Sequence, residues 1–165
     1  MEQQNSQATP REYRYSRRAI LATALATITV PGLARSQDAE IWSASAAYDS
    51  LVEDRIRIID VRSREEWVET GVARGAWPIS LHEARFSERL FAAKAIAEVR
   101  PIALICATGG RSGYVLRSLR NAGYKGYIDI SEGMLGSKRG PGWIAAGLPT
   151  VSAAEALEAL PNAVL

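Results

Sequence analysis

One stretch in the second half of the chain sets the strongest limit on how the protein can fold. Residues 102–105 are apolar and predict a buried strand, and Cys106 follows at the end of that strand. Gly109 and Gly110 then predict a tight loop. Apolar residues recur at helical spacing over residues 112–122, which predicts a helix directly after the loop. This succession of strand, short loop and helix is typical of proteins with a parallel sheet.

The loop after the strand gives Cys106 an environment that a cysteine in a hydrophobic core lacks. Successive backbone N–H groups of a glycine-bearing loop can point inward, in front of the positive end of a helix. Such a loop favours the thiolate, the nucleophilic form of cysteine, and Arg111 adds a fixed positive charge. The alternative is an inert buried cysteine, which is common after an apolar strand. Two glycines and an arginine beside Cys106 favour the reactive thiolate.

Predicted strands and helices alternate along the rest of the chain. A capping box at Ser63 and Glu66 marks the start of one helix. We expect strands at residues 41–42, 55–60, 77–81 and 127–130, and helices at residues 43–53, 64–70, 83–99 and from 152 onward. This alternation predicts an α/β fold with a parallel sheet that helices cover on both faces.

Residues 1–34 show the order of segments that is typical of an export signal. A polar stretch contains Arg17 and Arg18, and an apolar run followed by small residues comes next. The apolar run is shorter than the roughly 18 residues that cross a bilayer, so we expect no stable membrane span. The paired arginines resemble a twin-arginine signal, which implies a partner in the twin-arginine export machinery and a periplasmic location. An uncleaved amphipathic anchor is the alternative, and residues 35–40 are expected to be a linker.

Charge and residue counts narrow the classes of function. The chain has 165 residues and a formal net charge of +2, but residues 1–34 hold four arginines and two glutamates, so the remainder is neutral. We therefore expect no nucleic-acid partner. One Cys excludes an intramolecular disulfide, and one Cys with one His, His82, cannot build a usual metal site. We expect no metal and no organic cofactor, and we expect His82 to be a surface residue rather than a partner of Cys106.

The loop at Cys106 resembles the C-x-x-G-x-R-S active-site loop of the rhodanese-type sulfurtransferases. Its residues are Cys106, Ala107, Thr108, Gly109, Gly110, Arg111 and Ser112. A second rhodanese signature, D-V-R followed by E-(aromatic) and G-H-I-x-G-A, resembles the segment that contains Asp60, Arg62 and Glu66. These three residues have a largely structural role in that family. Val72 stands where the family usually has histidine, which affects local packing more than chemistry.

The resemblance implies a single rhodanese-like domain over residues 41–150, with a doubly wound small parallel sheet and helices on both faces. A C-terminal helix and tail over residues 151–165 would follow it. The resemblance also implies a thiosulfate sulfurtransferase, in which Cys106 takes a sulfane sulfur from a small-molecule donor such as thiosulfate and holds it as a persulfide. Cyanide, a thiol or a protein sulfur acceptor would then remove that sulfur. Backbone N–H groups of residues 107–111 would stabilise the negative charge. Lys138 and Arg139 either help to hold an anionic substrate or form a solvated basic turn.

Two other functions remain open at the level of sequence. Cys-based phosphatases and arsenate reductases also place a cysteine before a loop that ends in arginine, but they usually have one residue more between the two. The shorter ring between Cys106 and Arg111 should fit a sulfur atom better than a tetrahedral phosphate. A sulfur-carrying or partner-binding module without turnover would have the same reactive cysteine, so the sequence does not separate it from an enzyme.

Overall fold

The computed structural model describes residues 41–165. The expected export signal over residues 1–34 and the linker over residues 35–40 lie outside this range. Within the described residues, no helix combines the length and the apolar character that crossing a membrane requires.

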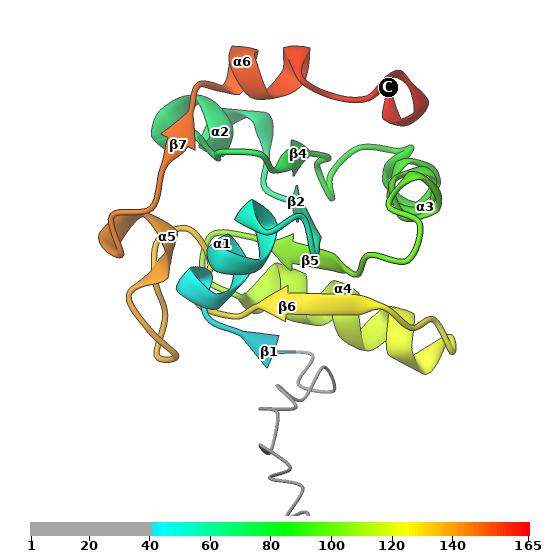
Figure 1. Ribbon diagram of the computed structural model, residues 1–165, viewed down its shortest axis with the longest axis horizontal. Helices are drawn as coiled ribbons and strands as arrows, with labels where there is room; N and C mark the ends of the chain where they lie inside the picture. Colours follow the sequence, from blue (N-terminus) through cyan, green and yellow to red (C-terminus); the bar gives the residue numbers. More distant parts are fainter. Residues whose placement is uncertain (1–40) are drawn as a thin grey trace, which may run out of the picture. The chain divides into compact units, whose positions relative to one another are not determined.

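A parallel sheet of five strands forms the centre of the domain, and its strands run in the order β1-β6-β5-β2-β4 (Figure 1). The strands are β1 (Ile41–Trp42), β2 (Arg57–Asp60), β4 (Trp77–Pro78), β5 (Ile102–Ile105) and β6 (Tyr127–Ile130). All residues of β5 and β6 are buried, as is all of β2 except its first residue. Continuous burial of this kind requires a cover on both faces of the sheet.

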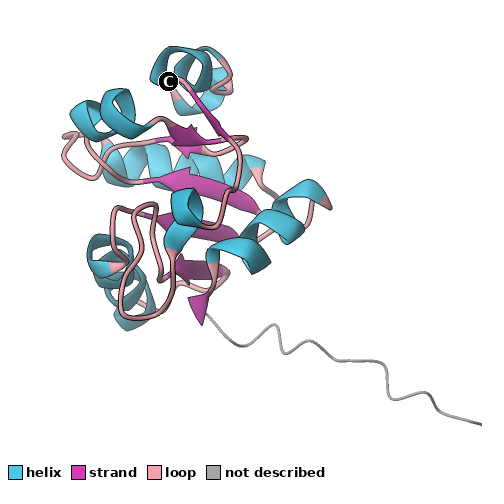
Figure 2. Cartoon of the chain, turned by 90° about the vertical axis from the view of Figure 1, so that its left-hand side faces the viewer, coloured by secondary structure: helices cyan, strands magenta, loops and turns pink. Residues whose placement is uncertain are grey.

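Helices cover both faces (Figure 2). The helices α3 (Phe86–Ile96) and α4 (Gly110–Asn121) pack on one face, whereas α1 (Ala44–Val52), α2 (Arg64–Thr70) and α5 (Gly142–Ala145) pack on the other. The short helix α6 (Ala153–Glu158) lies against β4, and the 3-10 helix η1 (Asn162–Val164) lies against α3. The strands β3 (Val72–Ala73) and β7 (Thr150–Val151) form a separate antiparallel pair. The predicted doubly wound α/β fold is therefore confirmed.

Successive side chains of the central strands point to opposite faces of the sheet, and this divides the core into two clusters. Ile59 and Leu104 pack toward α3 and α4, whereas Ile58 and Ile105 pack toward α1, α2 and α5. The second cluster contains two tryptophans, one on α2 and one on α5, that are among the largest fully buried side chains of the domain. Each central strand is thus held from both sides, which fixes where its carboxyl end lies.

The connections run in opposite directions from the two middle strands of the sheet. The chain leaves β2 through α2 and returns in β4, whereas it leaves β5 through α4 and returns in β6 on the other side. The carboxyl ends of β2 and β5 therefore border a topological switch point, which is where open α/β sheets bind ligands. Cys106 follows directly after β5 at this edge.

Several predicted boundaries differ from the structure, and strand β2, expected from residue 55, begins at Arg57. Helix α4 begins at Gly110 rather than at residue 112, because Gly109 in the left-handed conformation already serves as its N-cap. Helix α3 is shorter than residues 83–99, and Glu98 has a φ of 56°, which no helix continues. The expected strand over residues 77–81 contains only β4, although Ile79 still donates a backbone hydrogen bond to Asp60.

Candidate active site

Cys106 lies between the hydrophobic core and the loop that leads into α4. Its side chain is 1% exposed and belongs to the cluster that contains Phe86 and Val115. Ser112, in the first turn of α4, is fully buried, and its hydroxyl donates a hydrogen bond of 3.4 Å to the Cys106 Sγ. Strand β5 and helix α4 thus hold the thiol from two sides.

The orientation of two peptide groups determines which backbone N–H groups of the loop can bind an anion. The carbonyl of Cys106 accepts from the N–H of Met134, and the carbonyl of Ala107 accepts from the N–H of Leu135, each at 2.8 Å. In a trans peptide the C=O and N–H groups point in opposite directions. The N–H groups of Ala107 and Thr108 therefore point away from Met134 and Leu135.

These N–H groups are also unpaired. Within residues 41–165, the backbone N–H groups of Ala107, Thr108 and Gly109 donate no hydrogen bond to another protein group. Thr108 is exposed and Ala107 and Gly109 are half-buried, so these N–H groups are open to solvent and can donate to an anion. Free N–H groups at the N-terminus of α4 and the positive end of its dipole add to this donor set.

Two glycines let the loop pack directly on the segment that follows β6. Gly109 has a φ of 80°, and a Cβ on it would lie 2.0 Å from the carbonyl oxygen of Ser131. A Cβ on Gly133 would lie 2.3 Å from the carbonyl oxygen of Ala107. Gly110 differs from both, since no atom lies within 4 Å of its Cβ position. Of the two glycines in the predicted loop, only Gly109 is needed for the close approach.

Glu66 of α2 binds the half-buried side chain of Arg111 across the switch point. The Arg111 guanidinium donates two hydrogen bonds, of 2.7 Å and 2.5 Å, to the two carboxylate oxygens of Glu66. The hydrogen bond from Arg111 is the main cause that lowers the pKa of Glu66 to about 2. The hydrogen bond with Glu66 also raises the pKa of Arg111, and Cys106 makes a smaller contribution to this rise. Arg111 therefore lies near the sulfur and joins the loop to α2.

The buried Asp60–Arg62 pair contacts the end of α2, and no hydrogen bond among the described residues joins it to the loop at Cys106. Both side chains are buried, and the Arg62 guanidinium donates to the Asp60 carboxylate at 2.7 Å. Arg62 also donates to the Thr70 hydroxyl and the Gly71 carbonyl, each at 2.6 Å. These contacts tie the carboxyl end of β2 to the end of α2. They keep α2, and with it Glu66, in place.

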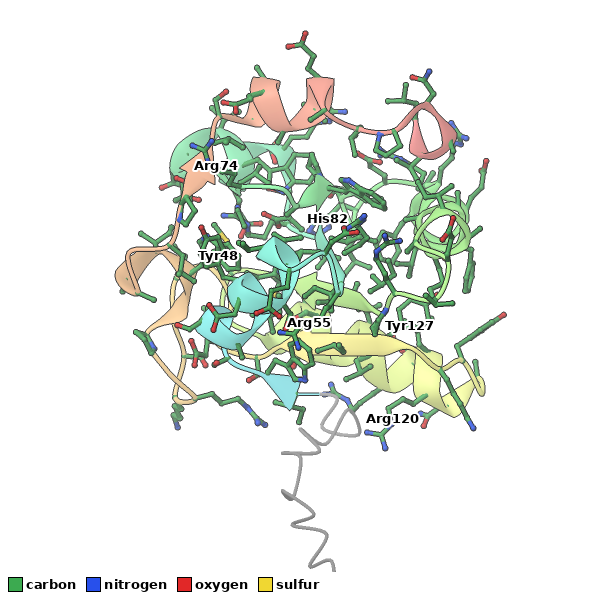
Figure 3. All side chains as sticks on the ribbon, in the orientation of Figure 1. Tyr48, Arg55, Arg74, His82, Arg120 and Tyr127 are labelled. Atoms are coloured by element: carbon green, nitrogen blue, oxygen red, sulfur yellow. The ribbon has the colours of Figure 1, made fainter. Side chains whose placement is uncertain are left out.

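Three basic residues considered from the sequence are not joined to the loop. His82 is exposed beyond β4, where Figure 3 labels it. Lys138 and Arg139 are exposed in the turn before α5. Among the hydrogen bonds and ion pairs of residues 41–165, none connects any of the three side chains with residues 106–112.

Two buried carboxylates near the loop were not singled out from the sequence. Glu132 accepts hydrogen bonds of 3.3 Å from the N–H groups of Ala44 and Gly142, and so ties the starts of α1 and α5 to the segment after β6. Asp129, in β6, is 5% exposed and lies behind Ser112. A carboxylate inside an otherwise apolar strand is the signal that would have drawn attention to Asp129.

Comparison with known proteins agrees with this fold and loop. The model of the family described as "Rhodanese-like domain" matches residues 43–139. An uncharacterized protein of Rickettsia conorii is 28% identical over 116 residues, which cover 64% of this chain and 92% of the relative.

Solved structures are also similar. The crystal structure of the Alr3790 protein from Anabaena has a TM-score of 0.53 and 23% identity, and the match covers 67% of this chain and 80% of that one. The polysulfide-sulfur transferase homodimer from Wolinella succinogenes has a TM-score of 0.49 and 24% identity, with 68% and 77% covered. Because the family model spans more than half of the sequence, the chain belongs to the rhodanese-like domain family.

Proposed function

We propose that the protein is a sulfurtransferase that carries a sulfane sulfur on Cys106, with thiosulfate as donor and cyanide or a thiol as acceptor. One observation above all supports this proposal. The N–H groups that follow Cys106 are unpaired, and two of them are turned away from the segment that binds the loop carbonyls. Donors in this arrangement stabilise negative charge on a sulfur atom without moving during the reaction.

The reaction needs two displacements at sulfur. The Cys106 thiolate attacks the outer sulfur of thiosulfate, a new S–S bond forms, and the S–S bond of the donor breaks with its electron pair leaving on sulfite. Cyanide or a thiolate then attacks the outer sulfur of the persulfide. The Cys106–sulfur bond breaks, and its electron pair returns to Cys106 as the thiolate. No group other than Cys106 has to change its covalent state.

The ion pair at Arg111 favours sulfur transfer over phosphate chemistry. A phosphatase of the cysteine class needs the arginine of its loop to bind phosphate oxygens with its forked donors. Here both ends of that fork donate to Glu66. The loop between Cys106 and Arg111 is also one residue shorter than in those phosphatases. Both features argue for a single sulfur atom, rather than a phosphate, as the group bound in the loop.

Mass spectrometry of the full-length chain tests the proposal. After treatment with thiosulfate, the intact mass should rise by one sulfur atom, and the variant Cys106→Ser should show no rise. Absence of the adduct with thiosulfate and with polysulfide would contradict the proposal. Turnover with cyanide then separates an enzyme from a sulfur carrier, and hydrolysis of an aryl phosphate that depends on Cys106 would favour the phosphatase alternative.

We also propose that the protein is exported to the periplasm by the twin-arginine route. The order of segments in residues 1–34 and the pair Arg17 and Arg18 support this proposal. Replacing both arginines by lysine should leave the protein in the cytoplasmic fraction. Unchanged export of that variant would contradict the twin-arginine assignment.

A further inference from the structure

Charge is unevenly distributed over the domain. Residues 101–154 contain six Lys and Arg residues but two carboxylates, Asp129 and Glu132. Both carboxylates are buried, with 5% and 7% of their surface exposed. The side chains that residues 101–154 expose therefore include cations and no carboxylate.

Four of these cations form no ion pair with the domain. Arg117, Lys125, Lys138 and Arg139 are exposed, and none of the ion pairs within residues 41–165 includes them. Other arginines of the described residues do bind carboxylates; these are Arg55, Arg57, Arg62, Arg64, Arg85, Arg89, Arg100 and Arg111. Exposed cations that form no internal ion pair can attract an anionic partner.

Lys138 and Arg139 form the tip of a short hairpin that follows β6. Ser137 and Gly140 exchange backbone hydrogen bonds of 2.9 Å and 3.2 Å across the tip, and the Ser137 Oγ accepts from the Arg139 N–H at 3.1 Å. The Ser137 hydroxyl also donates to the Ser131 carbonyl, against which the reactive loop packs. The tip with its two cations is therefore joined to the segment that supports the loop.

Two exposed apolar side chains lie at the base of this hairpin. We call residues 135–144 the basic hairpin. Leu135, at its start, is 54% exposed, and its N–H donates to the Ala107 carbonyl at 2.8 Å. Ile144, at its end, is 40% exposed, and its N–H donates to the Met134 carbonyl at 3.0 Å. The basic hairpin thus combines apolar contacts beside the reactive loop with charge farther out, as protein–protein interfaces do.

Close packing holds the basic hairpin in one conformation. Gly136 has a φ of 91°, and a Cβ on it would lie 2.5 Å from the Pro141 carbonyl oxygen. A Cβ on Gly140 would overlap a carboxylate oxygen of Glu132, which also accepts from the Gly142 N–H at 3.3 Å. A surface that is already formed loses less conformational entropy when a partner binds.

Lys125 provides a matched control, because it lies at the opposite edge of the sheet. Lys125 comes just before β6, whereas the basic hairpin follows β6. Figure 1 shows these two segments at opposite ends of that strand. Both Lys125 and Lys138 are exposed and form no ion pair, so a substitution at either one changes the net charge equally. Only Lys138 lies at the edge where Cys106 follows β5.

We propose that the basic hairpin docks a protein with an acidic surface, and that a thiol of this protein accepts the sulfur carried by Cys106. The charges of Lys138 and Arg139 speed the encounter with the acidic surface. Leu135 and Ile144 favour a protein over a nucleic acid, because they offer apolar contacts that a phosphate backbone does not use.

This inference rests on the proposed function of Cys106 and specifies the acceptor. The partner's thiolate attacks the outer sulfur of the Cys106 persulfide, and a new S–S bond forms on the partner. The bond between Cys106 and that sulfur breaks, and its electron pair returns to Cys106 as the thiolate. A partner docked beside the loop holds its thiol near the persulfide, which raises the rate of this step.

Peptide acceptors test the inference on the full-length chain. One peptide carries a cysteine beside a run of glutamates, and a second has glutamine in place of each glutamate. After Cys106 is loaded from thiosulfate, mass spectrometry follows the transfer of sulfur to each peptide at low ionic strength. Lys138→Glu and Arg139→Glu should each slow transfer to the glutamate peptide by about threefold and leave transfer to the glutamine peptide unchanged. Lys125→Glu should slow either transfer by less than about 1.5-fold.

The rates are compared between protein variants with the same peptide, because glutamates raise the pKa of a neighbouring thiol. Added salt should reduce the effect of Lys138→Glu, since it screens exposed charges. Equal effects of Lys138→Glu and Lys125→Glu, or equal effects on the two peptides, would overturn the inference. Binding to phosphatidylglycerol vesicles that depends on Lys138, without a difference between the peptides, would assign the basic hairpin to a membrane surface and would also overturn it.

Binding without sulfur transfer separates failure of the inference from failure of the proposed function. The glutamate peptide should bind the full-length Cys106→Ser variant, and Lys138→Glu in that background should weaken the binding by about threefold in fluorescence anisotropy. A protein that shows this binding but never forms a persulfide would refute the proposed sulfur transfer and leave the docking surface in place. A protein that transfers sulfur to 2-mercaptoethanol, but whose variants all react at the same rate with the glutamate peptide, would refute only the docking surface.

Discussion

Replacing Glu66 by glutamine tests how strongly the ion pair with Arg111 holds the loop to α2. Glutamine keeps the size of the side chain and can still serve in the capping box, where Glu66 accepts from the N–H of Ser63 at 3.0 Å. What the variant loses is the negative charge that faces the guanidinium. The change in stability should therefore report on the ion pair rather than on the start of the helix.

The expected size of the effect follows from the pKa of Glu66. The shift from 4.5 to about 2 corresponds to about 3.4 kcal/mol as an upper limit. The side chains of Arg111 and Glu66 are 31% and 28% exposed, so solvent screens part of this interaction. We therefore expect Glu66→Gln to lower the free energy of unfolding by about 1 to 2 kcal/mol at neutral pH.

The sign of the pH dependence is fixed by the direction of the shift. Because the pKa of Glu66 is lower in the folded state, its contribution is complete above pH 4.5 and is lost as the pH falls toward about 2. Urea unfolding followed by tryptophan fluorescence should show the difference between wild type and Glu66→Gln at pH 7 and almost none at about pH 2. Glu69→Gln, on the exposed side of the same helix, should change stability by less than about 0.5 kcal/mol. An equal loss for Glu66→Gln at both pH values would refute the reasoning.

Two further substitutions test the loop and its support. Gly109→Ala should lower the free energy of unfolding by more than about 2 kcal/mol and abolish the persulfide, because the φ of 80° and the Ser131 oxygen leave no place for a Cβ. The control Gly110→Ala should change the free energy of unfolding by less than about 0.5 kcal/mol, measured by urea unfolding as for Glu66→Gln. Arg62→Leu should lower the free energy of unfolding by about 3 to 5 kcal/mol, because it leaves the Asp60 carboxylate buried without its cation. A thermal unfolding curve that matches the wild type would contradict this prediction.

Local patterns predicted most of the fold and the identity of the loop. The apolar run before Cys106 and the capping box at Ser63 each depend on a few neighbouring residues. The strand β5 and the start of helix α2 form as these patterns predict. The alternation of strands and helices predicted a parallel sheet covered on both faces, and the resemblance to the rhodanese family added its doubly wound order. The boundary of α4 was misplaced because the left-handed Gly109 takes the part of a cap that sequence rules assign to a polar side chain.

The parts that were not predictable depend on contacts between distant segments. The hydrogen bond from the Ala44 N–H to the Glu132 carboxylate joins residues that are 88 positions apart in the sequence. No local pattern shows that this carboxylate binds the start of a helix. The same is true of the N–H groups of Met134 and Leu135, which orient the peptides of the loop. Asp129 could have been noticed as a charge within an apolar strand, but its position beside Gly113 follows only from the packing of β6 against α4.

The backbone contacts between the loop and the segment after β6 bear on how such a site can be transplanted. Residues 106–112 contain Cys106, but their backbone contacts with residues 131–135 determine how the loop curves. A graft of the first segment alone into another scaffold would bring the cysteine and leave the peptides free to rotate. Protein engineers who want this loop conformation in another protein would have to move both segments together, at the spacing that strands β5 and β6 impose.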